Sequence, residues 1–154
     1  VAKMLNSSSD AEDIAQQVFI RLWKSAKRYK EKAKFTTFLY TITRNLVFNE
    51  SKRRQRKKQV SIEERAEESH LEIAGKEIDH PDNSVLQAEL QTAVDNAIQQ
   101  LPETQRMAVI LRRYEQLSYE EIAAVLNTSV SAVKSQLFRA RSALRELLSQ
   151  YLES

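Results

Sequence analysis

Hydrophobic residues recur every three or four positions along most of the chain, which is the spacing of helices that bury one face. A first helix is expected at 10–28, with an apolar face made of Ile14, Val18, Leu22 and Trp23, and with Phe19 and Ala26 beside it. A second helix begins near Phe35 and repeats the pattern at Leu39, Ile42 and Leu46. Four more helices are expected at about 86–100, 102–114, 118–126 and 130–152. The pattern therefore predicts an all-α fold.

The ends of these later helices carry recognisable signals. Ser118 and Glu121 have the spacing of a capping box, in which each side chain satisfies a backbone N–H of the other residue. A three-residue segment separates the last two helices: Asn127 can adopt the left-handed conformation that ends a helix, and Thr128 or Ser129 can cap the next one. Two helices joined by so short a turn predict a helix-turn-helix unit, so the last four helices form a four-helix domain of this kind.

The final helix has two chemically different faces. Its buried stripe is expected to comprise Val130, Val133, Leu137, Ala140, Leu144 and Leu147. The opposite face offers small residues, cations and a phenyl ring: Ser131, Ala132, Lys134, Ser135, Phe138, Arg139 and Arg141, with Ser129 just before the helix. Small residues let a backbone enter a major groove, cations meet phosphates or guanine edges, and a phenyl ring can touch a thymine methyl group. This face predicts DNA binding.

Composition supports the helical fold and excludes several kinds of site. The 154 residues include one Gly and two Pro, too few for a sheet protein with many tight turns. With no Cys and two isolated His, the chain lacks disulfides, thiolate metal sites and a histidine metal cage. Asp10, Glu12 and Asp13 resemble a metal cluster, but helix capping accounts for them. We expect no metal, cofactor or catalytic residue, because we find no phosphate loop and no nucleophile with a partner base.

Charge divides the chain into three parts. Residues 1–58 hold 15 Lys or Arg against 5 Asp or Glu, residues 59–89 hold 2 against 9, and residues 90–154 hold 7 against 7. This distribution predicts two small helical domains, 1–58 and 86–154, joined by an acidic linker at 59–85. About 30 extended residues reach roughly 100 Å, far enough for both domains to contact one DNA molecule. Without a long apolar run or a secretory signal pattern, we expect a cytoplasmic protein and no membrane insertion.

The stretch LPETQRMAVILRRYEQLSYEEIAAVLNTSVSAVKSQLFRARSALREL, at 101–147, resembles the C-terminal domain of bacterial RNA polymerase sigma factors. The resemblance is to the sigma-70 family, extracytoplasmic-function (ECF) type, in which the last helix of this domain reads the −35 promoter element. Four positions depart from the family pattern, which leaves the promoter sequence open: Asn127 replaces the usual Gly, Ser131 and Ala132 replace a common Gly-Thr, and Gln136 replaces a frequent Arg.

The first domain resembles the same family independently. DAEDIAQQVFIRLWK, at 10–24, is similar to the helix that docks on the clamp of the largest polymerase subunit. KFTTFLYTITRNLVFNESKRR, at 34–54, is similar to the helix that binds the −10 element, although Phe38 replaces a more frequent Trp. The resemblance implies polymerase contacts at Asp10, Asp13, Gln16, Gln17 and Phe19. It implies −10 element contacts at Tyr29, Lys34, Thr41, Asn45, Asn49, Lys52, Arg53 and Arg54.

A sigma factor would direct promoter recognition and DNA melting without chemistry of its own. The partners that the resemblance implies are core RNA polymerase, through its clamp and flap, promoter DNA and an anti-sigma factor. The residues alone leave three alternatives: a helix-turn-helix regulator that binds operator DNA without polymerase, a helical adaptor whose basic faces hold acidic proteins, and a nuclease. The nuclease is least favoured, because clustered carboxylates for two metals are missing.

The N-terminal stretch is shorter than the family pattern. At least one helix precedes the clamp-binding helix in the family, whereas nine residues precede Asp10 here. We therefore expect a truncated first domain, in which part of the stripe Leu39, Ile42 and Leu46 stays uncovered unless a partner or a second copy covers it.

Overall fold

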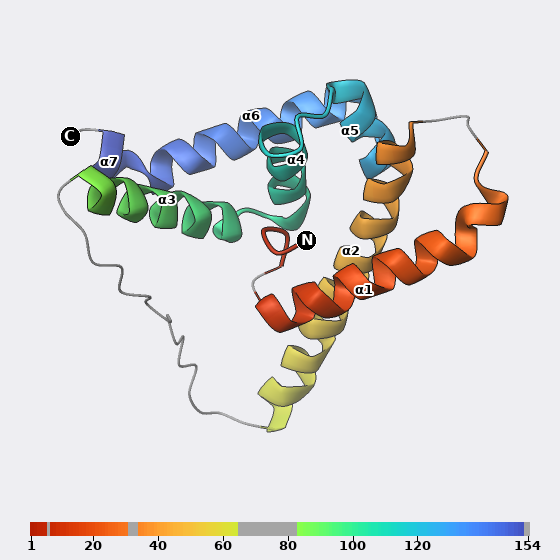
Figure 1. Ribbon diagram of the computed structural model, residues 1–154. Coiled ribbons are helices and arrows are strands. Elements are labelled where there is room, and N and C mark those ends of the chain that lie inside the picture. Colours follow the sequence, from red (N-terminus) through yellow and green to blue (C-terminus); the bar gives the residue numbers. More distant parts are fainter. Residues whose placement is uncertain (6, 31–33, 65–82, 153–154) are drawn as a thin grey trace.

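The computed structural model describes residues 1–5, 7–30, 34–64 and 83–152, and every regular element in these ranges is helical (Figure 1). The elements are α1 (Ser8–Ser25), a 3-10 turn η1 (Ala26–Arg28), α2 (Phe35–Glu64), α3 (Asn83–Gln100), α4 (Glu103–Arg113), α5 (Tyr119–Leu126), α6 (Val130–Leu147) and α7 (Ser149–Leu152). The predicted all-α class is confirmed.

Several helix ends differ from the expectation, and those of α2 and α6 differ most. Helix α2 continues to Glu64, past the boundary at 58, and its C-terminal part extends beyond the other helices (Figure 1). The added turns consist largely of polar residues with good helix propensity but no apolar stripe, so periodicity could not detect them. Residues 65–82 of the expected linker lie outside the described residues, and its last three residues, 83–85, belong to α3, which begins at Asn83. Helix α6 ends at Leu147 rather than near 152, and the short helix α7 follows it.

The caps of the helix-turn-helix unit form as the sequence indicates. Ser118 Oγ accepts from the Glu121 N–H at 3.1 Å, and Glu121 Oε2 accepts from the Ser118 N–H at 2.8 Å. Asn127 is left-handed, with φ 52° and ψ 53°, and Ser129 caps α6 by accepting from the Ala132 N–H. At the start of α1, Ser7 is the cap residue, because its Oγ accepts from the Asp10 N–H.

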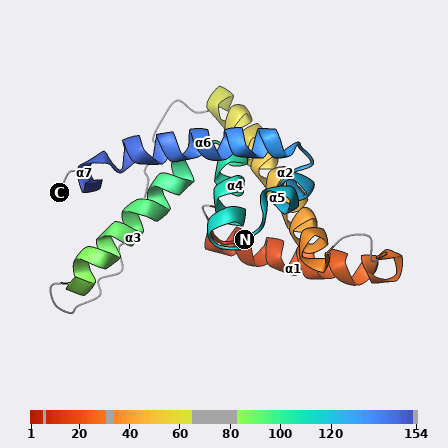
Figure 2. The same ribbon diagram turned by 90° about the horizontal axis from the view of Figure 1, so that it is seen from above.

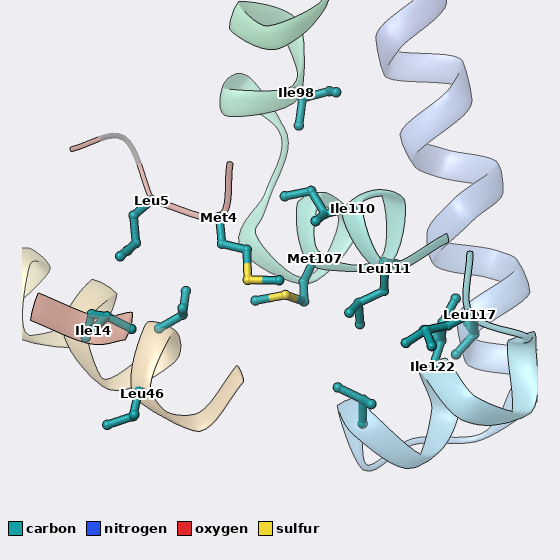
Figure 3. Close-up of a cluster of buried hydrophobic side chains, with 14 of the residues drawn as sticks. Met4, Leu5, Ile14, Leu46, Ile98, Met107, Ile110, Leu111, Leu117 and Ile122 are labelled. Carbon is teal, nitrogen blue, oxygen red and sulfur yellow. The ribbon is translucent and has the colours of Figure 1, made fainter. Parts of the chain in front are cut away.

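One continuous hydrophobic cluster runs through both expected domains. In Figure 3, Met4 and Leu5 lie between two groups of buried side chains, one that contains Ile14 and Leu46 and one that contains Met107. Helix α1 packs across α2, α2 packs along α5, and α5 and α4 both pack on α6. The expected −10 helix and the expected helix-turn-helix unit are therefore in direct contact.

The stripe on α2 is covered mainly by the chain itself. Leu46 is buried, and Leu39 and Ile42 are half-buried and pack against the core. The expectation was that part of this stripe stays uncovered: Leu46 is covered within the chain, where α1 and α5 lie against α2, while Leu39 and Ile42 keep part of their surface open.

Some residues expected in the core lie at the surface. Trp23 is 84% exposed and Phe19 is 67% exposed, because the buried stripe of α1 is narrow and comprises Ala11, Ile14 and Val18. Leu147, at the end of the expected stripe of α6, is also exposed. The spacing was correct for helix, but it does not tell which apolar side chains a neighbour covers.

Candidate nucleic-acid interface

Helix α6 separates an apolar inner face from a cationic outer face. Val133, Leu137 and Ala140 are buried against α4 and α5, at steps of four and three residues. The predicted DNA-binding residues lie on the other side: Ser131, Lys134, Ser135, Phe138, Arg139 and Arg141 are exposed, as is the cap residue Ser129, while Ala132 is half-buried. The structure therefore brings the whole predicted set to one helix.

The outer face of α6 borders a surface depression of about 690 Å³. Its lining comprises Tyr119, Lys134, Ser135, Leu137, Phe138, Arg139 and Arg141. Among the described residues, none of the three cations in this lining forms an ion pair, so their charge is available to a polyanion. Phe138 is 71% exposed, which is unusual for a large apolar side chain.

Sequence reasoning missed two residues that shape this depression. The guanidinium of Arg112 lies over the Tyr119 ring, 4.8 Å from its centroid, and Nη1 of Arg112 donates to the Leu117 carbonyl at 2.8 Å. Arg112 thus ties α4 to the start of α5 and holds the Tyr119 ring at the edge of the outer face. An aromatic residue directly after the Ser118 cap was the available signal.

The predicted −10 stripe on α2 is partly open. Asn45, Asn49 and Lys52 are exposed, and Lys52 has no ion-pair partner among the described residues. Thr41 is half-buried and its hydroxyl donates to the Thr37 carbonyl at 2.7 Å, one turn earlier in the helix. Two amide side chains and a free cation on one face can contact base edges and a phosphate.

Other predicted contact residues pair with each other. Arg54 forms an ion pair with Asp10, which links the predicted −10 surface to the predicted polymerase surface within the chain. Arg53 donates two hydrogen bonds of 2.9 Å to Glu50, and Arg54 lies 3.4 Å from the same carboxylate. The Asp10 to Arg54 ion pair holds α1 against α2, whereas the contacts with Glu50 lie within α2. Asp10 and Arg54 therefore have a structural role that spacing could not indicate.

Lys34 is held by the helix-turn-helix unit. Its Nζ lies 2.8 Å from Glu121 Oε1, and this contact raises the pKa of Lys34. The same bond, together with the Ser118 N–H, lowers the pKa of Glu121 to about 2. Tyr29 packs its ring against Phe35 and Phe38, with centroids 6.2 and 5.2 Å apart. Residues 31–33 lie outside the described residues.

Helix α1 presents a mixed polar and apolar outer face. Asp13, Gln16, Gln17 and Phe19, the residues predicted for polymerase binding together with Asp10, are all exposed. Ile20 and Trp23 are exposed beside them, at 44% and 84%. Sequence reasoning placed Trp23 in the core, and its exposure enlarges the apolar part of this surface.

A groove of about 590 Å³ lies between α3, α4 and α6, where α3 and the C-terminal half of α6 diverge in the view from above (Figure 2). Apolar residues form part of its lining: Val94, Ile98, Val109, Leu137 and Leu144. Cations at its edge are Arg112, Arg113 and Arg141. The groove was not predicted, because it is assembled from three helices.

The described residues offer no cluster of side chains suited to holding a metal ion. Across the same ranges, every helix is too short or too polar to cross a bilayer.

Comparison with known proteins identifies this arrangement of helices. A family model of sigma-70 region 2 matches residues 1–57, and a model of sigma-70 region 4 matches residues 91–144. The chain is also 35% identical over 154 residues to the RNA polymerase sigma-H factor of Pseudomonas aeruginosa, covering 99% of this chain and 80% of that protein. This chain belongs to the sigma-70 family.

Other relatives agree with this assignment. This chain is 37% identical over 139 residues to the ECF RNA polymerase sigma-E factor of Escherichia coli, and the match covers 89% of this chain and 73% of that protein. Among solved structures, the sigma factor RpoE from Bartonella quintana, in complex with the anti-sigma factor NepR, matches with a TM-score of 0.73 and 25% sequence identity. The match covers 96% of this chain and 86% of that one. The structure of CnrH in complex with the cytosolic domain of CnrY shares the fold, with a TM-score of 0.61 and 22% identity, and the match covers 94% of this chain and 74% of that one.

The family assignment settles the general role of the chain. A sigma factor of the ECF type directs promoter recognition in transcription initiation, and its helix-turn-helix region 4 is a DNA-binding element. The alternative of an operator-binding regulator that acts without polymerase is not favoured, because region 2 accompanies region 4 in one chain. Sigma factors in general are not enzymes.

Proposed function

We propose that this sigma factor holds promoter DNA at two places, with α6 on the −35 element and α2 on the −10 element. The single observation that carries the proposal is the outer face of α6. It presents Lys134, Arg139 and Arg141 without ion-pair partners in the described part of the chain, around an exposed Phe138. A helix that buries its other face and starts with small residues suits the major groove.

The −35 contact is assigned to the start and middle of α6. Ser129, Ser131 and Ala132 let the helix approach the groove, Lys134 and Ser135 face base edges, and the two arginines lie near phosphates. Phe138 contacts a thymine methyl group. Arg112 acts as a positioning residue, because it holds Tyr119 at the rim of the same depression.

The −10 contact is assigned to the polar stripe of α2. The side chains of Asn45 and Asn49 offer a donor and an acceptor each, which suits the base edges that an unpaired strand exposes. Lys52 supplies a free cation for the backbone, and Thr41 and Tyr29 border the site. Arg53 contributes once DNA displaces its pairing with Glu50, and Arg54 contributes once DNA displaces its pairings with Glu50 and Asp10. Melting follows from preferential binding of the open strand.

Two other surfaces fit protein partners. The outer face of α1, with Asp13, Gln16, Gln17 and Phe19, is proposed to dock on the polymerase clamp, and Trp23 adds apolar area to it. The groove between α3, α4 and α6 is proposed to take the flap. An anti-sigma factor is a further proposed partner, supported by the relative RpoE, which was solved in complex with one.

Run-off transcription with core RNA polymerase tests the proposal. The unsubstituted chain should produce specific start sites on genomic templates, and both Lys134→Ala and Asn45→Ala should reduce transcription at least severalfold. Arg145→Ala is the matched control for the first variant, because Arg145 lies about 16 Å further along α6, beyond the turns that enter a groove. Wild-type protein that yields no specific start site would refute the proposed function.

A further inference from the structure

The N-terminal half of α3 leaves its apolar face uncovered. Leu86, Leu90, Val94 and Ile98 follow one another at every fourth residue, so they lie on one face of the helix. Ile98 is buried where α3 packs on α4 and α6, and Val94 is half-buried. Towards the start of the helix, Leu90 is 43% exposed and Leu86 is 63% exposed. No described segment covers this first part of the stripe.

The C-terminal end of α6 carries a second uncovered apolar surface. Leu144 lines the groove between α3, α4 and α6, and Leu147, almost one turn further on, is 39% exposed. Tyr151 in α7 is exposed to the same extent. Seen from above, α3 and this end of α6 spread apart like two arms (Figure 2). The groove lies where the arms meet, so apolar side chains continue from it along both arms.

Helix α3 is poor in charge for a helix at the surface. Its 18 residues include two charged ones, Glu89 and Asp95, and both are acidic. Asp95 pairs with Lys3 at 3.1 Å, whereas Glu89 is exposed and has no ion-pair partner in the described ranges. Other exposed polar positions are uncharged: Gln87, Gln91, Thr92 and Asn96. Depletion of charged residues around exposed apolar ones is typical of the centre of a protein–protein interface.

The groove has the opposite charge at its edge. Arg112, Arg113 and Arg141 border it, and Arg113 and Arg141 are exposed without an ion pair within the part of the chain that the structure describes. One chain therefore carries an apolar helix with a free carboxylate and an apolar groove with free cations. A surface that is complementary to itself is what a two-fold symmetric dimer requires.

We propose that two copies of this chain pair face to face through α3 and the C-terminal end of α6. The four helices form a bundle with their apolar faces inward. The two-fold axis places the N-terminal half of α3 of each copy over the groove of the other, with Glu89 next to Arg113 of the second copy. This inference goes beyond the proposed function. Since the groove is also proposed for the flap, one chain cannot hold a second copy and the flap at the same time.

The available area indicates a weak dimer. An 18-residue helix is about 27 Å long and about 10 Å across, so two arms side by side present roughly 540 Å² per copy. A dimer buries about twice that area, roughly 1,100 Å², which is close to the lower end for specific interfaces. Dissociation constants in the micromolar range are therefore expected, at about 1–100 μM.

Sedimentation equilibrium of the free protein tests the dimer. The mean mass should rise from that of one chain towards that of two between about 1 and 100 μM. Leu86→Gln should keep the protein monomeric over this range. Val85→Gln is the matched control, because Val85 is 42% exposed on the same turn but points about 100° away from Leu86. Both variants alter exposed side chains, and circular dichroism checks that each retains its helix content.

Exchange of charges tests the proposed orientation. Glu89→Arg and Arg113→Glu should each weaken the dimer severalfold, because each places like charges opposite one another. The two substitutions together should restore the wild-type dissociation constant, since they exchange the charges and keep the pair. A double variant that dimerises no better than the single variants would overturn the pairing of α3 with the groove.

Two further results overturn the dimer itself: a wild-type chain that stays monomeric at the highest concentration, which leaves the groove to the flap alone, or Leu86→Gln that associates as Val85→Gln does. The measurement uses neither polymerase nor DNA. A chain that dimerises as expected but yields no start site in run-off transcription would therefore refute the proposed function and leave the dimer intact.

Discussion

Two neighbouring residues of α6 should respond in opposite ways to truncation. Leu137 is 4% exposed and lies in the core, while Phe138 is 71% exposed and borders the outer face. We expect Leu137→Ala to lower stability, and Phe138→Ala to leave stability unchanged and weaken binding to −35 DNA. Both positions lie next to each other in α6, so the two variants differ mainly in which face of the helix loses a side chain.

The magnitudes follow from burial. Leu137→Ala removes a buried side chain and leaves a cavity, which costs about 2–5 kcal/mol of the free energy of unfolding. For a chain of this size, that loss corresponds to a melting temperature lower by roughly 4–20 °C. Complete burial of a Phe side chain contributes about 1.5–3 kcal/mol. Since most of the Phe138 surface is still available to DNA, its contact contributes about 1–2 kcal/mol, or roughly tenfold in affinity.

Two measurements check this prediction. Thermal unfolding gives the stability of each variant, and fluorescence anisotropy with a promoter duplex at one fixed salt concentration gives the affinity. A melting temperature of Phe138→Ala as low as that of Leu137→Ala would show that Phe138 belongs to the core. If Phe138→Ala binds the duplex with the same affinity as the wild-type protein, Phe138 is not part of the interface.

Four further outcomes are expected. Ser118→Ala should lower the free energy of unfolding in urea by about 1 kcal/mol, because it removes the cap of α5. Gln116→Gly should raise it by roughly 0.5 kcal/mol, because Gln116 has φ 54° and glycine adopts that conformation without strain. Lys134→Ala should reduce the slope of log affinity against log salt by about 1, measured by anisotropy. In the folded protein the pKa of Glu121 is lowered from the usual 4.5 to about 2, so the stabilisation by its ionised form should be complete above pH 4.5 and lost as the pH falls to about 2. Lys34→Met should raise the pKa of Glu121, measured by NMR titration.

The helix-turn-helix unit could be predicted in detail because local rules determine it. The capping box of Ser118 and Glu121, the left-handed Asn127 and the Ser129 cap each depend on residues within four positions of one another. Backbone groups at a helix end need a nearby partner, so the residue types that supply one are readable from sequence. The outer face of α6 follows from the same local geometry.

Contacts between distant segments could not be predicted in this way. Asp10 and Arg54 look like two separate surface charges in the sequence, and only the crossing of α1 and α2 brings them together. Trp23 has the chemistry of a core residue, yet no described segment covers it. Periodicity gives the direction in which a side chain points, whereas burial depends on which helix arrives on that side.

Glu121 takes part both in the cap of α5 and in a contact with α2, and the two contacts use different oxygen atoms. Its Oε2 accepts from the Ser118 N–H and completes the cap of α5, while its Oε1 holds Lys34 of α2. Releasing Lys34 breaks the second bond and leaves the first, so the start of α5 keeps its geometry. Likewise, Asn127 and Ser129 set the turn before α6 through contacts within α5 and α6 alone. The groups that shape the turn before α6 are therefore separate from the groups that hold α2 against α5, so the form of α6 that suits a major groove does not depend on the contact between α2 and α5.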